Sequence, residues 1–197
     1  NIGTAKVAMK LGESRLHKYI SEMGFGRRSG VSLPGEVRGI LHPVNKWSKL
    51  SISRIPMGHG VAATPMQLVM AMSAMANGGN LMRPLLVDRL VDRDGNVVMQ
   101  YNPTVVRKVI HDETAQQMVE MLVTVVSDEG TARLAWLQNF TVAGKTGTAQ
   151  KPSKTKRGYD AGKYFSSFIG FLPAKNPQLC IGVFVDEPHN GYYGGVV

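Results

Sequence analysis

The sequence has very little cysteine, with Cys180 alone among 197 residues. A single cysteine excludes an internal disulfide and any zinc site built from several thiolates. Its place in the apolar run from Leu179 to Val185 predicts a small, buried hydrophobic side chain. The 5 histidines show neither H-E-x-x-H nor paired spacing. We therefore expect no metal site and no cofactor.

Long apolar runs are also missing. No segment reaches the roughly 18 apolar residues that a membrane-spanning helix needs. The first residues, 1–6 (NIGTAK), contain neither an initiator methionine nor the apolar segment of a signal peptide, and are typical of the interior of a longer chain. With 43% hydrophobic and 19% charged residues, the chain is long enough to bury a core. The composition predicts one domain, or most of one.

Acidic residues are few, since 14 Asp and Glu stand against 23 Lys and Arg, which gives a net charge of +9. Such an excess raises the question of a nucleic-acid or anionic-surface partner. The densest basic segment, residues 151–157 (KPSKTKR), lacks the aromatic side chains that single-strand binding requires. We interpret it as a solvated loop between strands, and expect no nucleic acid among the partners.

Local patterns predict helices and one hairpin in the first half of the chain. Apolar residues recur at helical spacing over residues 2–23, and Gly12 favours a break there. Residues 26–49 predict a loop. A helix from Pro65 to about Asn77 is indicated by a cap and a capping box that Thr64 and Gln67 form. Its apolar residues are expected to pack in the core: Met66, Leu68, Met70, Met72 and Met75. Residues 86–100 predict a hairpin that turns at Asp94-Gly95-Asn96.

The second half begins with a helix and continues with strands. We expect the helix over residues 112–126, with Asp112 as its N-cap. One face of it is predicted to carry Met118, Met121, Leu122 and Val125. Three extended segments follow, at residues 141–150, 164–172 and 179–186. Their closeness in sequence predicts an antiparallel sheet with packed helices, which is the α+β class.

Residues 142–151 (VAGKTGTAQK) raise two chemical alternatives. Gly144-Lys145-Thr146 ends a phosphate-binding P-loop motif, but that motif needs an earlier glycine where Asn139 stands. The residues before the tripeptide favour a strand, and Pro152 follows too soon for a helix. The nucleotide-binding alternative is therefore disfavoured.

A strand at this place suits acyl transfer. Alternation puts Lys145 and Gly147 on one side and the two threonines, Thr146 and Thr148, on the other. Such a site uses the lysine near a nucleophile, the glycine for close approach of the helix that carries it, and the hydroxyls for a ligand. At a sheet edge the backbone also pairs with an extended peptide.

K-T-G is one of three motifs of the serine enzymes that react with penicillins. Here Lys-Thr-Gly-Thr-Ala follows GHGVAATPMQL and precedes YFSSFIGFLP, IGVFVDEP and GYYGG. Taken together, residues 58–69, 142–149 and 164–194 closely resemble the transpeptidase domain of class B penicillin-binding proteins, which cross-link peptidoglycan. The resemblance implies the penicillin-binding transpeptidase/β-lactamase-like fold and covers nearly the whole chain.

The resemblance also implies that part of the domain lies outside residues 1–197. Asn1 resembles the third residue of the family's S-x-N motif, and the nucleophilic serine belongs to an S-x-x-K motif further upstream. We therefore expect the chain to be the C-terminal portion of the transpeptidase domain, without the S-x-x-K segment and without the last helix.

Site roles follow from the same resemblance. Lys145, Asn1 and Thr148 are expected to take part in catalysis, through proton movement, substrate positioning and a backbone N–H of the oxyanion hole. Thr146, Gly147 and Thr148 are expected to bind the substrate, with the hydroxyls on its terminal carboxylate. An apolar wall is expected from Tyr164, Tyr192 and Tyr193. Ordinary packing at strand ends remains the alternative for these tyrosines.

The implied activity is that of a peptidoglycan D,D-transpeptidase that forms a serine acyl-enzyme and is inhibited by β-lactam antibiotics. A serine β-lactamase, and a β-lactam-binding sensor or non-catalytic scaffold, are the alternatives. The implied partners are peptidoglycan stem peptides, β-lactams, the upstream segment of the same domain, a membrane glycan polymerase, and division or elongation proteins. The implied location is the extracytoplasmic (periplasmic) face of the inner membrane, with an upstream anchor.

Overall fold

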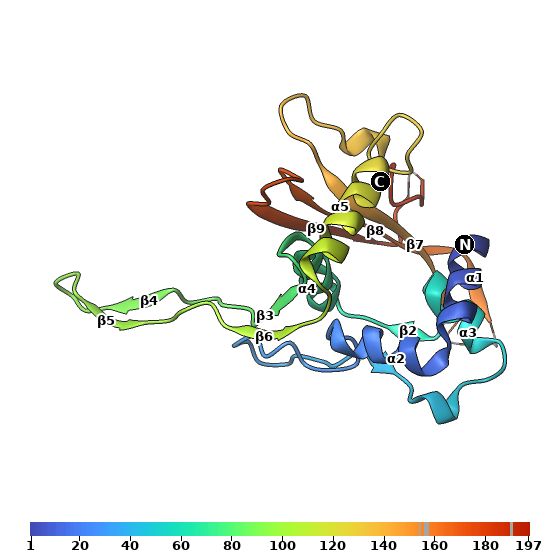
Figure 1. The fold of residues 1–197 in the computed structure, drawn as a ribbon, viewed down its shortest axis with the longest axis horizontal. Coiled ribbons are helices and arrows are strands. Elements are labelled where there is room, and N and C mark those ends of the chain that lie inside the picture. Colours follow the sequence, from blue (N-terminus) through green and yellow to red (C-terminus); the bar gives the residue numbers. More distant parts are fainter. Residues whose placement is uncertain (154, 156–157, 190) are drawn as a thin grey trace. The chain divides into compact units, whose positions relative to one another are not determined.

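The computed structural model describes residues 1–153, 155, 158–189 and 191–197 (Figure 1). The chain forms two compact units, each described by itself below. The first comprises Asn1–Ala74 and Asn80–Val109, and the second comprises Met75–Gly79 and Ile110–Val197. Helices and antiparallel strands together confirm the α+β class.

The first unit opens with two helices, α1 (Ile2–Leu11) and α2 (Glu13–Glu22). Gly12 separates them with a φ of 86°, which confirms the predicted break. Residues 26–49 are mostly irregular, as expected, apart from short elements. The short elements of this unit are β1 (Ile40–Leu41), η1 (Val44–Lys46), α3 (Ser51–Arg54), η2 (Ile55–Met57) and β2 (Val61–Ala62). Strand β1 pairs antiparallel with β2, and α1 contacts both α3 and η2.

Helix α4 (Pro65–Ala76) begins with the predicted capping box. The Gln67 backbone N–H donates to Thr64 Oγ1 at 3.1 Å, and the Thr64 N–H donates to Gln67 Oε1 at 2.9 Å. The Gln67 side-chain amide also donates to the carbonyls of Gly24, Arg27 and Arg38, at 3.4, 2.6 and 2.9 Å. Gln67 is 2% exposed, so one buried amide ties the start of α4 to the preceding loop.

The prediction that the long apolar residues of α4 lie in the core was wrong in part. Gln67 and Ala74 are its buried residues, whereas the methionines and Leu68 are only half-buried. Ala74 is 1% exposed, and the polar Gln67 is buried because its amide is satisfied by backbone carbonyls.

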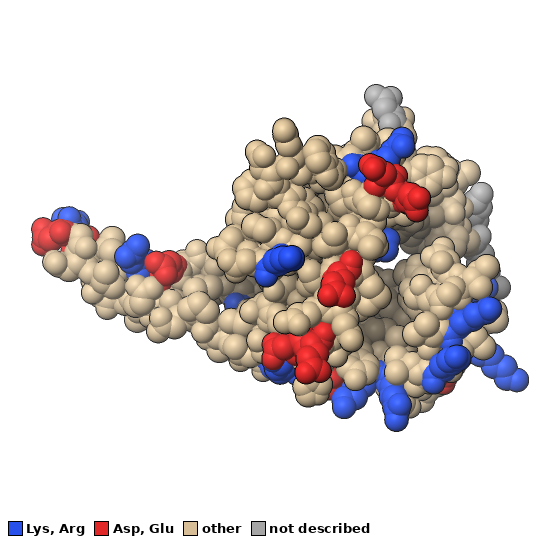
Figure 2. Space-filling model, turned by 45° about the horizontal axis from the view of Figure 1, so that its top comes forward, with Lys and Arg blue, Asp and Glu red and all other residues tan. Residues whose placement is uncertain are grey.

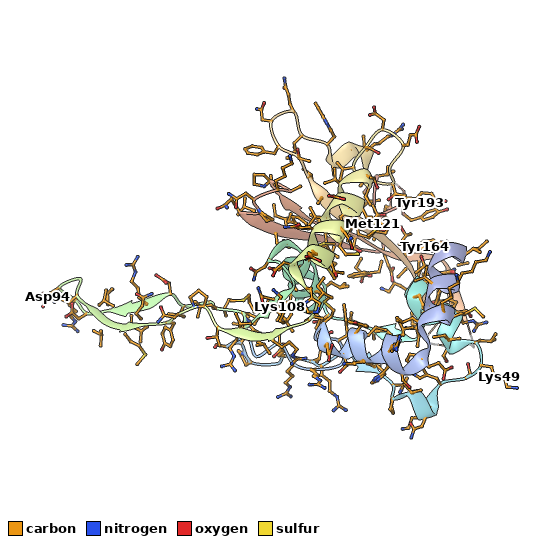
Figure 3. The ribbon with its side chains drawn as sticks, in the orientation of Figure 1. Lys49, Asp94, Lys108, Met121, Tyr164 and Tyr193 are labelled. Carbon is orange, nitrogen blue, oxygen red and sulfur yellow. The ribbon has the colours of Figure 1, made fainter. Side chains whose placement is uncertain are left out.

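The rest of the first unit is a two-stranded ribbon. Strand β3 (Asn80–Met82) pairs antiparallel with β6 (Val105–Lys108), and β4 (Arg89–Val91) pairs antiparallel with β5 (Val97–Gln100). The β4–β5 hairpin turns around Asp94, labelled in Figure 3, which confirms the predicted hairpin. All residues of β4 and β5 are exposed, and the hairpin carries charges of both signs (Figure 2).

The second unit combines one long helix with a three-stranded sheet. The helix is α5 (Asp112–Thr124), which is followed by the turn η3 (Arg133–Ala135). The strands are β7 (Ala143–Pro152), β8 (Tyr159–Leu172) and β9 (Leu179–Asp186). They are antiparallel in the order β7-β8-β9, which confirms the predicted meander. Helix α5 contacts β7 (Figure 1).

Two details of α5 correct the sequence analysis. The N-cap is His111, and Asp112 is instead an acidic residue of the first turn, where it suits the positive end of the helix dipole. Met121 is 56% exposed and does not belong to the buried face. The buried residues of α5 are Ala115 and Leu122. They are seven residues apart, which is about two helical turns, and therefore lie on the same side of the helix.

Candidate active site

The Lys145–Thr148 segment lies on β7, an edge strand of the β7-β8-β9 sheet. In the β7–β8 register, Thr146 is opposite Phe168 and Thr148 is opposite Ser166, so the two threonines share one sheet face, as predicted. An edge strand offers backbone N–H and C=O groups to an extended peptide. The position of the motif therefore suits recognition of a peptide substrate.

The Lys145 ammonium does not stay on its own side of the strand. Its Nζ donates to the Thr146 backbone carbonyl at 3.0 Å and to Thr146 Oγ1 at 3.3 Å. A flexible four-carbon stem allows this, although the Cα positions alternate. Burial of the ammonium lowers the pKa of Lys145 below its usual value of 10.5. Alternation alone predicted a separation between the amine and the hydroxyl that the structure does not have.

Thr131 also belongs to this polar cluster. Its Oγ1 lies 3.0 Å from Thr146 Oγ1. The residue follows the turn at Gly130 and was missed by sequence reasoning, because an isolated threonine in a turn matches no catalytic motif. The cluster therefore contains one ammonium and two hydroxyl groups: Lys145, Thr131 and Thr146.

Thr148, the second threonine of the motif, binds the backbone of the segment that carries the tyrosine pair. The Gly194 backbone N–H donates to Thr148 Oγ1 at 3.0 Å. Beside it on β8, the Ser166 hydroxyl donates a short hydrogen bond to the Tyr192 carbonyl, and Ser166 is 1% exposed. Sequence reasoning missed Ser166 as well, because its partner is 26 residues further along the chain.

The three predicted wall tyrosines lie together, as Figure 3 shows for Tyr164 and Tyr193. The rings of Tyr164 and Tyr192 stack with centroids 4.2 Å apart, and those of Tyr192 and Tyr193 are 4.4 Å apart. The Tyr192 hydroxyl donates to the Tyr193 hydroxyl at 3.2 Å, and this bond raises the pKa of Tyr192. The tyrosines thus form one aromatic surface, attached to the sheet by the Ser166 and Thr148 contacts.

Close backbone approach explains two glycines of the site. A Cβ on Gly194 would collide with the Gly147 carbonyl and with the backbone of Ser167. A Cβ on Gly147 would meet Ser167 Oγ at 2.5 Å. The missing side chain of Gly147 therefore leaves room for the Ser167 hydroxyl on β8, and the helix approach expected from sequence stays a prediction.

Asn1 belongs to the first unit and precedes α1. Its backbone carbonyl accepts a hydrogen bond from the Ala5 N–H at 3.0 Å, and its side chain makes no capping hydrogen bond. The catalytic role expected for Asn1 stays a prediction.

The described residues contain no group of three or more His, Cys, Asp or Glu side chains that could hold a metal ion. Cys180 is half-buried rather than fully buried, and burial raises the pKa of its thiol. Over the same described ranges, no helix has the length and apolar character needed to cross a membrane.

The basic segment 151–157 is described only in part, because Lys154, Lys156 and Arg157 lie outside the described residues. Lys151 Nζ contacts Asp186 Oδ1 and Glu187 Oε1, each at 2.8 Å. These carboxylates raise the pKa of Lys151. The charge of this lysine is thus balanced by acids at the end of β9.

Comparison with known proteins decides the family. All 197 residues, 1–197, match the family described as "Penicillin binding protein transpeptidase domain". The chain belongs to this family. The match confirms the resemblance to class B penicillin-binding proteins and the fold that it implied.

Individual members of the transpeptidase family are similar to this chain over its full length. Stage V sporulation protein D of Bacillus subtilis is 39% identical over 199 residues, which cover 100% of this chain and 30% of that protein. The probable peptidoglycan D,D-transpeptidase PenA of Neisseria meningitidis is 31% identical over 198 residues, covering 100% of this chain and 32% of that protein. This chain therefore spans about a third of the length of these relatives.

The chain is also similar to solved structures of penicillin-binding proteins. Penicillin-binding protein 3 of Mycobacterium tuberculosis, complexed with aztreonam, superposes with a TM-score of 0.88 at 32% identity. The alignment covers 94% of this chain and 43% of that structure. Similarity at this level supports transfer of the fold to nearly all of the present chain.

Proposed function

We propose that the protein containing this chain is a peptidoglycan D,D-transpeptidase that reacts through a serine acyl-enzyme and is inhibited by β-lactams. The observation that carries the proposal is the Lys145 ammonium bound to Thr146 Oγ1 on an edge strand, in a member of the transpeptidase family. The PenA relative, named as a probable peptidoglycan D,D-transpeptidase, and the aztreonam complex support it.

The reaction begins with a stem peptide that ends in D-alanyl-D-alanine. The serine of the family's S-x-x-K motif, assigned to no residue of this chain, attacks the carbonyl between the two D-alanines. The ester forms as the amide bond breaks, and the terminal D-alanine leaves with a proton on its amine. An amine of a neighbouring stem peptide then attacks the ester, which forms the cross-link and regenerates the serine.

The residues of this chain bind and orient the donor peptide. The hydroxyls of Thr146 and Thr148 hold the terminal carboxylate, and the Thr148 backbone N–H donates to the oxyanion. Lys145 adds positive charge beside these hydroxyls and supports proton transfer. Gly147 leaves the strand open to the substrate, and Asn1 orients the substrate amide.

The aromatic surface of Tyr164, Tyr192 and Tyr193 forms an apolar wall beside the acyl group. Stacked rings are already ordered before a ligand binds. Contact with them therefore loses little side-chain entropy. The short contacts of Ser166 and Thr148 with residues 192 and 194 support this role, because they fix the wall to the motif strand.

The proposal includes a place in the cell. The protein is held in the cytoplasmic membrane by an upstream segment, with this domain on the extracytoplasmic face. It works with a glycan polymerase of the membrane and with division or elongation proteins. The match to a protein named for sporulation also fits a sporulation role.

Intact mass spectrometry of the whole protein with benzylpenicillin tests the reaction. We expect a stable, stoichiometric adduct on one serine, and D-alanine release with cross-linked product from stem peptides. Absence of the adduct would refute the serine acyl-enzyme. Catalytic turnover of benzylpenicillin would indicate a β-lactamase instead. An adduct without peptide cross-linking would indicate a β-lactam sensor or a scaffold.

A further inference from the structure

Thr131 makes a polar contact that neither the motif nor the family match explains. Its Oγ1 lies 3.0 Å from Thr146 Oγ1, across 15 residues of chain. Thr131 is exposed, so the hydrogen bond is not needed to satisfy a buried hydroxyl. A contact kept at a solvent-accessible position, beside a proposed ligand-binding hydroxyl, points to a function in that site.

Neighbouring residues hold Thr131 in place. The next residue, Ala132, is 0% exposed and packs with Val126 and Val142 in a buried cluster. Its backbone N–H donates to the Val125 carbonyl at 2.9 Å. Because Val142 directly precedes β7, the turn that carries Thr131 and the strand that carries the motif share one rigid core.

Gly195 restricts the space beside Thr131 and Thr146. A Cβ at this position would collide with the Thr131 carbonyl and would lie 3.2 Å from Thr146 Cγ2. The backbone therefore passes directly against both threonines. Neither hydroxyl-bearing residue can move in that direction without displacing the segment that carries the aromatic wall.

The hydrogen-bonding capacity of Thr146 Oγ1 determines which hydroxyl donates in the contact between Thr131 and Thr146. A hydroxyl has one proton to donate and two lone pairs that accept. The Lys145 ammonium can only donate, so it occupies one lone pair at 3.3 Å. When Thr131 donates to the second lone pair, the Thr146 proton has to point elsewhere, and a carboxylate that accepts it completes the arrangement.

We infer that Thr131 is a positioning residue, which directs the Thr146 hydroxyl proton toward the carboxylate of an acyl donor. The inference rests on the proposed function, in which Thr146 binds that carboxylate. The recognised ligand class is a peptide or β-lactam with a free carboxylate. Thr131 acts through Thr146, and a ligand without the negative charge gains nothing from it.

The test compares two ligands on the whole protein, benzylpenicillin and its methyl ester. In the unmodified protein we expect faster acylation by the carboxylate form. Thr131→Val keeps the side-chain shape and removes the hydroxyl. We expect it to slow acylation by benzylpenicillin roughly 5- to 30-fold, the effect of one hydrogen bond to a charged system. Acylation by the ester stays unchanged, so the preference for the carboxylate shrinks.

Two further variants separate positioning from damage to the fold. Thr131→Ser restores the hydroxyl, and we expect it to restore the preference for the carboxylate ligand. Thr141→Val makes the same chemical change at another exposed threonine shortly before β7, and we expect wild-type rates with both ligands.

The outcomes are distinct for the inference and for the proposed function. An equal loss of rate with both ligands in Thr131→Val, or no loss with either, overturns the inference while the acyl-enzyme remains. Failure of Thr131→Ser to restore the preference overturns it as well. If the unmodified protein reacts with neither ligand, the proposed function fails, and the inference fails with it.

Discussion

The Gly194 backbone N–H donates a 3.0 Å hydrogen bond to Thr148 Oγ1. Beside its proposed role in ligand binding, Thr148 therefore fixes the backbone that follows the tyrosine pair. Accepting from Gly194 occupies one lone pair and leaves the hydroxyl proton for a ligand. The same side chain thus couples the motif strand to the proposed aromatic wall.

Ser166→Ala tests the second hydrogen bond that couples the sheet to the tyrosine segment. Ser166 is 1% exposed, and its hydroxyl donates to the Tyr192 carbonyl. We expect the substitution to lower the free energy of unfolding by about 1 kcal/mol and to slow benzylpenicillin acylation about fivefold, because the Tyr192 backbone loses its hydrogen bond to β8. Denaturant unfolding and acylation kinetics measure the two effects. Ser127→Ala, at an exposed serine, is the control and is expected to leave acylation unchanged. Wild-type acylation in Ser166→Ala would show that the wall does not depend on this bond.

Gly195→Ala tests the close approach of the same segment to Thr131. The added methyl group would collide with the Thr131 carbonyl, so the backbone has to shift. We expect a destabilisation of roughly 1–3 kcal/mol, typical of overpacking, and a loss of acylation. Gly3→Ala is the matched control in α1, where a Cβ meets nothing within 4 Å. Helix propensity predicts that it stabilises by roughly 0.5–1 kcal/mol. Equal stability of the two alanine variants would contradict the predicted contact.

The sequence predicted elements well where the signal is local. The capping box of Thr64 and Gln67 and the strand that carries Lys145 depend on neighbouring residues, and both are confirmed. The exposure of Met121 was missed, because several registers of an apolar helix look alike until the buried partner is known. Composition gives no information about that partner.

The placement of the motif residues on one strand was predicted from sequence, and their roles stay predictions. Thr131 and Ser166 were not found, because their hydroxyls bond to residues 15 and 26 positions away and no local pattern encodes such distances. The Lys145 ammonium lies closer to Thr146 than strand alternation predicts, because alternation describes Cβ directions and not the reach of a long side chain.

Gln67→Leu tests the buried amide that ties α4 to the loop before it. The substitution removes the donor to the Arg27 and Arg38 carbonyls, bonded at 2.6 and 2.9 Å, and the cap acceptor for Thr64. The two lost hydrogen bonds and the lost cap contact are worth about 0.5–1.5 kcal/mol each, so we expect a loss of at least about 1.5 kcal/mol in denaturant unfolding. Gln116→Leu makes the same change at an exposed position of α5 and is expected to stay within about 0.5 kcal/mol of the wild type. If both substitutions lowered the free energy of unfolding by a similar amount, the Gln67 amide would not be what ties α4 to the loop.

The pH dependence of acylation tests the charged form of Lys145. Burial lowers the pKa of this ammonium below 10.5, and only the ammonium form adds positive charge beside Thr146 Oγ1. We therefore expect acylation to fall as pH rises through the lowered pKa, which places the alkaline limb below pH 10.5. Lys145→Arg keeps its charge to higher pH and is expected to move this limb upward. Lys145→Ala removes the charge and is expected to slow acylation by at least about 100-fold at pH values below the lowered pKa, with a smaller difference from the wild type above it.

The sign of the stability effect separates this loss of activity from unfolding. A lysine with a lowered pKa in the folded state costs stability below that pKa, and the cost disappears as pH rises toward the unfolded value. Lys151 behaves in the opposite way, because Asp186 and Glu187 raise its pKa and its contribution is present at lower pH and lost above about 10.5. Lys151→Gln is therefore the matched control: we expect it to change the alkaline unfolding profile and to leave the acylation limb where it is. If Lys151→Gln moved the acylation limb to lower pH together with the unfolding transition, the limb would report general alkaline unfolding, and the assignment of its pKa to Lys145 would be wrong.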